Sequence, residues 1–98
     1  MLFALICKDK PGHLHVRKKT RPEHAAYLDG LNDSGLLKFA GPFLDGKGDP
    51  IGSMVMVEVE DQAAAEVIAA GDPYAKAGLF GSVEVLPWNW VFNKPENA

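Results

Sequence analysis

The stretch Ser53-Met54-Val55-Met56-Val57-Glu58-Val59 decides the fold. In an extended strand, successive side chains point to opposite faces of the sheet. Two methionines therefore share one face of this stretch, and two valines share the other. Because both faces are apolar in either register, the stretch predicts a central strand that is covered on both sides.

The segments on either side of this strand predict a hairpin and a helix. Residues 36–40 (LLKFA) favour a strand that Gly41-Pro42 ends, and the turn-rich residues 45–50 (DGKGDP) join it to the central strand. Beyond the central strand, Asp61 can cap an alanine-rich helix that Gly71 can end.

The N-terminal third predicts one strand and one helix. Residues 2–7 form a short apolar run, which the loop residues 9–12 follow. Residues 20–23 (TRPE) indicate a helix start, with a threonine cap, a capping-box glutamate and a proline tolerated in the first turn. This helix should end near Gly35. The residues on its inward face follow the helical repeat: His24, Tyr27, Leu28 and Leu31.

At the C-terminal end, Asp72-Pro73 predicts a short helix to about Ala77, and residues 82–86 predict the last strand. An aromatic tail covers about residues 87–98. The order strand, helix, hairpin, helix, strand is the ferredoxin-like β-α-β-β-α-β arrangement of the α+β class, with both helices on one face of the sheet. Residues 1–98 are expected to form one domain.

The face of the sheet without helices predicts a homodimer. An apolar face needs a cover, and a chain of 98 residues buries only part of its surface by itself. A second copy is the simplest cover, which gives a dimeric α+β barrel. The alternative is a monomer whose aromatic tail folds back over the sheet. Trp88 and Trp90 could line a pocket or, as we favour, seal the dimer.

Composition excludes several classes of protein. A formal net charge of -3 argues against a nucleic-acid binder. Cys7 is the only cysteine, so no intramolecular disulfide can form, and a reducing cytoplasm is the expected location. The apolar N-terminal run lacks a basic leader and meets the charged residues 8–10 too early for a secretion signal or a membrane span.

Two residues are candidates for proton-transfer chemistry. An imidazole on the apolar face of a helix, as at His24, can act as a general base or acid near neutral pH if a carboxylate orients it. Asp72 lies at a Gly-Asp-Pro break, where its carboxylate can point into a cleft. The alternatives are a hydrogen-bonded core histidine and an ordinary helix N-cap.

Four basic residues precede or begin the first predicted helix, where the positive end of the helix dipole disfavours cations unless an anion lies among them. They are Arg17, Lys18, Lys19 and Arg21. They predict an acidic small-molecule ligand, and a solvated loop is the alternative. Tyr27 and Tyr74 could donate hydrogen bonds to that ligand or serve in packing.

Other kinds of site find little support. The pair His13 and His15 has no nearby carboxylate or cysteine to complete a metal site. The serines at 34, 53 and 82 lack the setting of a nucleophile, and Cys7 in an apolar strand should be inert. No glycine-rich phosphate loop occurs. We therefore expect neither a metal nor an organic cofactor.

A set of dispersed residues forms a recognisable pattern when it is taken in chain order. The residues are Arg17, Arg21-Pro22-Glu23-His24-Ala25-Ala26-Tyr27-Leu28, Gly35, Gly41-Pro42, Gly52, Asp72-Pro73-Tyr74, Ala77-Gly78-Leu79, Val85 and Pro87-Trp88. In this order they resemble the YCII-related (YciI-like) family. The resemblance implies a dimeric α+β barrel with a histidine and an aspartate in its active site, which by position are His24 and Asp72. It also implies kinship with muconolactone isomerase-like proteins and proton abstraction on small ring compounds, including loss of chloride from chlorinated hydroquinones. His13, His15 and the aromatic tail look particular to this chain.

The resulting hypothesis is a small enzyme of the isomerase, lyase or dehydrohalogenase type. In it, His24 oriented by Asp72 moves a proton on a small cyclic substrate, and Arg17 or Arg21 holds the acidic group of an anionic one. One alternative is a dimeric binding protein without catalysis. Another is an interaction module that uses Trp90 and Phe92 as anchors.

Overall fold

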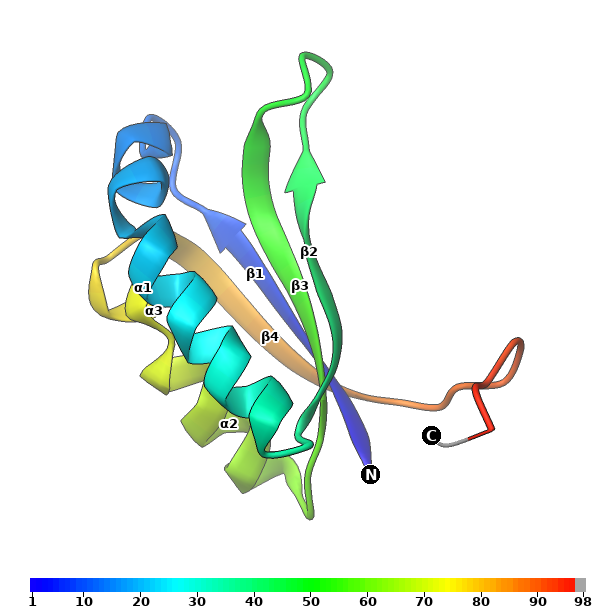
Figure 1. The fold of residues 1–98 in the computed structure, drawn as a ribbon. Helices are drawn as coiled ribbons and strands as arrows, with labels where there is room; N and C mark the ends of the chain where they lie inside the picture. Colours follow the sequence, from blue (N-terminus) through cyan, green and yellow to red (C-terminus); the bar gives the residue numbers. More distant parts are fainter. Residues whose placement is uncertain (97–98) are drawn as a thin grey trace.

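The computed structural model describes residues 1–96, which form a four-stranded antiparallel sheet with all three helices on one face (Figure 1). The strand order is β2-β3-β1-β4. The predicted ferredoxin-like α+β fold is confirmed. The elements are β1 (Leu2–Asp9), α1 (Leu14–Asp33), β2 (Leu37–Leu44), β3 (Pro50–Glu58), α2 (Gln62–Gly71), α3 (Pro73–Lys76) and β4 (Phe80–Trp88).

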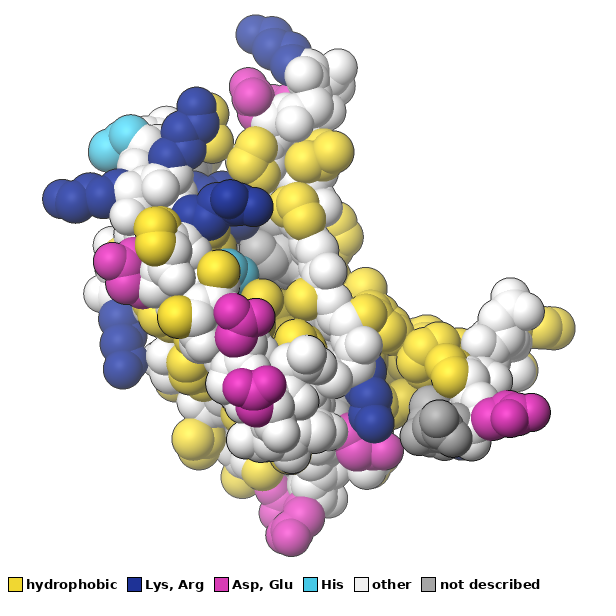
Figure 2. All heavy atoms as spheres, in the orientation of Figure 1, with side chains coloured by type: hydrophobic (Ala, Val, Ile, Leu, Met, Phe, Trp, Pro, Cys, Tyr) yellow, Lys and Arg dark blue, Asp and Glu magenta, His cyan; other side chains and the backbone are white. Residues whose placement is uncertain are grey.

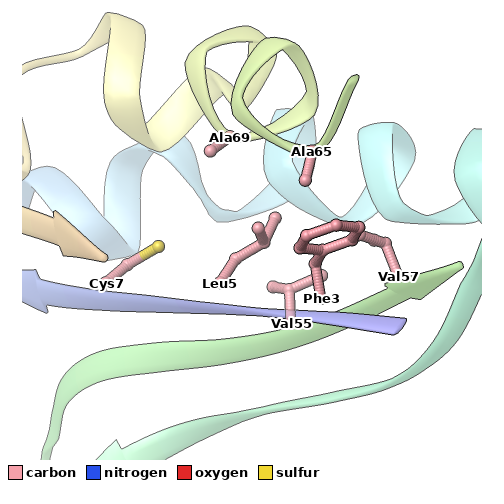
Figure 3. Packing of buried hydrophobic residues seen from close by; sticks show 7 residues of the cluster. All are labelled: Phe3, Leu5, Cys7, Val55, Val57, Ala65 and Ala69. Atoms are coloured by element: carbon pink, nitrogen blue, oxygen red, sulfur yellow. The ribbon is translucent and has the colours of Figure 1, made fainter. Parts of the chain in front are cut away.

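The core lies between the two central strands and the helices (Figure 3). β1 and β3 pair so that Leu5 lies opposite Val55, and both side chains point toward the helices. Ala65 and Ala69 of α2 face this layer, and their small side chains allow the helix to pack closely on the sheet. The buried cluster consists of Phe3, Leu5, Cys7, Val55, Val57, Ala65 and Ala69.

The opposite face of the sheet carries no helix (Figure 1). Met56 pairs with Ala4 and Phe39 on this face. Phe39 in turn makes edge contacts with Trp88 and Trp90, at centroid distances of 6.1 and 5.2 Å. These aromatic rings cover only part of the face, since Leu86 and Trp88 remain 44% and 40% exposed.

Helix α1 begins earlier than the sequence predicted. It starts at Leu14 instead of residue 20, and Pro22 lies inside it. His13 is its N-cap, and the carbonyl of His13 accepts the N–H of Arg17 at 3.1 Å. The longer helix depends on a tertiary contact. Asp9 of β1 holds the Arg17 side chain, and this ion pair offsets the free-energy cost of a proline inside the helix.

The predicted end of the second strand was also wrong. Strand β2 runs through Gly41-Pro42 to Leu44. It is an edge strand, so no other strand lies on its outer side. Pro42, which has no N–H to donate, can therefore lie in it without breaking a hydrogen bond between strands on that side. The predicted caps are present: the Asp61 side chain accepts the N–H of Ala64 at 2.9 Å and thereby starts α2.

Within residues 1–96, no helix has the length and apolar character needed to cross a membrane.

The closest packing of a glycine in the sheet gives a test of the fold. A Cβ on Gly52 would lie 2.5 Å from the carbonyl oxygen of Cys7, so Gly52→Ala should force β1 and β3 apart and cost roughly 1–3 kcal/mol of unfolding free energy. Gly41→Ala on β2 is the matched control, because a Cβ there meets no atom within 4 Å. Denaturant unfolding of both variants would measure the difference, and equal midpoints would contradict this packing.

Candidate active site

A cleft lies between α1 and the β2–β3 hairpin, on the helix-covered side of the sheet. Its cavity has a volume of about 410 Å³, within the usual range for small-molecule sites. Figure 2 shows basic side chains and a histidine gathered around this hollow. The lining residues are Arg17, Lys18, Arg21, His24, Ala25, Leu28, Ala40, Gly41, Pro42, Pro50, Ser53, Val55 and Tyr74.

His24 and Asp72 meet at the inner wall of the cleft. His24 Nδ1 lies 2.8 Å from Asp72 Oδ1, and both side chains are buried. The same carboxylate oxygen accepts the backbone N–H of Tyr74 at 2.9 Å, so Asp72 also caps α3. An ionised carboxylate can only accept, and Nδ1 is therefore the donor. In a neutral imidazole with this arrangement, Nε2 carries no hydrogen and can accept a proton.

Tyr74 fixes the plane of the imidazole. Its ring stacks on His24 at a centroid distance of 3.9 Å and an interplanar angle of 15°. The guanidinium carbon of Arg17 lies 4.7 Å from the centroid of the same ring. Burial raises the pKa of the Tyr74 hydroxyl, although the nearby Arg17 charge opposes the increase. Tyr74 therefore lines the cavity as a neutral aromatic wall.

Arg17 is buried and held by two partners. Its Nε and one terminal nitrogen donate to the carboxylate of Asp9 at 2.7 and 2.8 Å. The terminal nitrogen also donates to Ser53 Oγ at 3.0 Å. Burial acts to lower the pKa of Arg17, but the hydrogen bonds and charge of Asp9 outweigh it and raise that pKa. Arg17 is therefore a permanent cation whose charge Asp9 neutralises.

The remaining predicted residues fall into two groups. Lys18 and Arg21 line the cavity alongside His24, whereas Lys19 is exposed on α1 outside the lining. Tyr27 lies outside the lining too, and its hydroxyl donates to the carbonyl of Ile68 at 2.8 Å. Burial, and secondarily the charge of Asp72, raise the pKa of the Tyr27 hydroxyl.

Two residues that shape the cleft were missed by sequence reasoning. The sequence pattern placed Asp9 in a loop and Ser53 in the central strand, and the only chemistry considered for Ser53 was that of a nucleophile. In the structure, Asp9 and Ser53 both accept hydrogen bonds from Arg17. No spacing rule links these positions, because β1, β3 and α1 are brought together by the fold alone.

The other reactive side chains have structural roles. His13 Nδ1 lies 2.8 Å from the carbonyl of Pro11, and its ring tilts against that of His15 at 6.0 Å. Within residues 1–96, no group of three or more potential metal ligands occurs. Burial, with a smaller effect of the Asp72 charge, raises the pKa of the Cys7 thiol to about 12, so this thiol is a poor nucleophile near neutral pH.

Comparison with known proteins places this chain in a family. Residues 1–89 match the YCII-related domain. Protein YciI of Escherichia coli is 39% identical over 99 residues, covering 94% of this chain and 100% of that protein. An uncharacterised protein of Haemophilus influenzae is 34% identical over 98 residues, with the same coverage.

Two solved structures share the fold. The 5-chloro-2-hydroxyhydroquinone dehydrochlorinase of Burkholderia phenoliruptrix, solved in complex with 2,5-dihydroxybenzoquinone, has a TM-score of 0.84 and 34% identity. The match covers 91% of this chain and 94% of the dehydrochlorinase. An antibiotic biosynthesis monooxygenase has a TM-score of 0.51 at 17% identity, with 91% and 99% covered, which shows likeness of fold alone.

The contribution of the contact between Asp72 and His24 to stability can be measured by comparing two aspartates that both cap helices. Asp72→Ala removes a cap and also leaves a buried imidazole without its partner, so it should cost about 1–3 kcal/mol more than a cap alone. Asp61→Ala removes only an exposed cap, a loss of about 1 kcal/mol. The measurement is the free energy of unfolding in urea, and an equal loss in the two variants would show that the histidine contact contributes nothing.

Proposed function

Because the chain belongs to the YCII-related family, we propose that it is a small-molecule enzyme in which His24, oriented by Asp72, transfers a proton on a small cyclic substrate. The observation that carries this proposal is the 2.8 Å contact between His24 Nδ1 and Asp72 Oδ1 at the wall of a cavity of about 410 Å³. A carboxylate in this position holds one tautomer of the imidazole and stabilises the imidazolium that forms.

The reaction needs only proton movement and an acidic carbon. Nε2 takes the proton, and the electron pair of the broken C–H bond forms a new double bond in the ring. In a chlorinated hydroquinone, the carbon that carries chlorine becomes tetrahedral in the keto tautomer of the ring. Nε2 then takes the proton of another ring hydroxyl, the electrons of that O–H bond form a carbonyl, the ring double bond shifts, and chloride leaves with its bonding electrons, so the ring loses one equivalent of hydrogen chloride. Positioned acid–base catalysis of this kind contributes about 10²- to 10⁴-fold in rate.

The class of substrate follows from the cavity and from a relative. The lining is apolar on the side of β2 and β3, and basic side chains stand on the side of α1. The dehydrochlorinase that is 34% identical to this chain acts on a chlorinated, hydroxylated ring, as its name states. An oxygenated six-membered ring is therefore the substrate class that we propose, with an acidic group facing the basic side chains.

We also propose that the protein functions as a homodimer through the helix-free face of the sheet. Leu86 and Trp88 lie on this face and remain exposed in the single chain. A patch of this kind on a chain of 98 residues is typical of an association surface.

The proposed chemistry can be tested by chloride release from 5-chloro-2-hydroxyhydroquinone. His24→Asn and Asp72→Asn should each lower kcat by about 10²- to 10⁴-fold, because each removes part of the base. His15→Asn is the control, since His15 is exposed and lies outside the cavity lining. Folding of each variant would be checked by circular dichroism.

Full activity in folded His24→Asn would exclude the mechanism. Tight binding of the substrate without turnover by the wild type would instead identify a binding protein.

The dimer is tested by sedimentation velocity of a variant that carries a charge on the open face. Leu86→Lys should produce monomers, because an unpaired buried ammonium opposes association. Val67→Lys is the matched control, since Val67 is 71% exposed on α2, on the other side of the sheet. A dimer that survives Leu86→Lys, or a wild-type monomer, would refute this surface.

A further inference from the structure

The charges around the cleft are unbalanced. Three cationic side chains line the cavity, and no aspartate or glutamate among residues 1–96 does so. The charge of Arg17 is matched by Asp9. Within the described residues, neither of the other two, Lys18 and Arg21, forms an ion pair. Two uncompensated positive charges therefore remain at the mouth of the cavity.

The geometry of α1 directs these charges toward His24. Arg21 precedes His24 by three residues, so the two lie about 5–6 Å apart on one face of the helix. Lys18 precedes Arg21 by the same interval and continues the row. Burial raises the pKa of the Tyr74 hydroxyl, and among the opposing effects is the charge of Arg21. The Arg21 guanidinium therefore lies close enough to the cavity wall to act on a group there.

The rest of the cavity is suited to a flat ring. Leu28 and Val55 contribute apolar surface, and Tyr74 contributes an aromatic one. Ser53 Oγ accepts a hydrogen bond from Arg17, so its own hydrogen can be donated to an oxygen on the ring. A molecule that satisfies all of these groups has an apolar body, an oxygen substituent and one acidic edge.

We propose that Lys18 and Arg21 form an anion subsite that selects ring compounds already ionised at neutral pH, and that Arg17 is not part of this subsite. The inference rests on the proposed function for the use of the cavity, but it concerns binding and not proton transfer. Arg17 is excluded because Asp9 neutralises its charge, and because Asp9 and Ser53 take the hydrogens of its Nε and of one terminal nitrogen. A charge-assisted hydrogen bond to each free cation should strengthen binding roughly 10- to 100-fold.

The test compares two ring ligands by isothermal titration calorimetry at pH 7. One is 2,5-dihydroxybenzoquinone, whose acidic hydroxyls are ionised at this pH, and the other is hydroquinone, which is neutral. Lys18→Gln and Arg21→Gln should each weaken binding of the ionised quinone by roughly 10- to 100-fold and leave hydroquinone binding unchanged. Lys19→Gln is the matched control: it removes the same charge from the same helix, one residue away and outside the cavity lining.

Three results would overturn the subsite: equal affinity of the wild type for both ligands, failure of the wild type to bind the quinone, or equal effects of Lys18→Gln and Lys19→Gln. Its failure can be told apart from failure of the catalytic proposal, because His24→Asn keeps both cations. Binding that depends on Lys18 and Arg21 in a protein that releases no chloride would support the subsite and contradict the chemistry. Chloride release by a protein that binds the ionised quinone and hydroquinone with equal affinity would do the reverse.

Discussion

A single carboxylate oxygen connects the local structure of this chain to its candidate chemistry. Asp72 Oδ1 accepts the N–H that begins α3 and also contacts Nδ1 of His24 on α1. Because the carboxylate is buried, leaving either partner unbonded would be costly, and the two bonds hold α1 and the α2–α3 junction in one arrangement. The position of Asp72 therefore has two results: it caps α3 and it orients the histidine.

Around this oxygen, the polar groups form a connected series. Asp9 binds Arg17, Arg17 lies over Tyr74, and Tyr74 stacks on the imidazole. Among residues 1–96, no fully buried side-chain nitrogen or oxygen lacks a hydrogen-bond partner. A fully satisfied network is rigid, and rigidity is what a general base needs to keep its reacting nitrogen in place. The apolar layer of β1, β3 and α2 supports the network from below.

Much of this arrangement could be predicted from local patterns in the sequence. Alternation in the third strand, the caps at Asp61 and Asp72 and the turn at residues 45–50 are decided by neighbouring residues, so they were correctly predicted. The start of α1 was not correctly predicted. A capping box around Thr20 favours a later start, but the tertiary ion pair of Arg17 favours the earlier one, and no local pattern reveals that pair. For the same reason, the buried ion pair of Arg17 with Asp9 was not predicted.

The two members of the candidate pair lie 48 residues apart in sequence but on the same chain. The contact joins α1 to the α2–α3 junction, so it forms only when these elements pack together. A chain in which they come apart keeps both residues but loses the orientation of the imidazole.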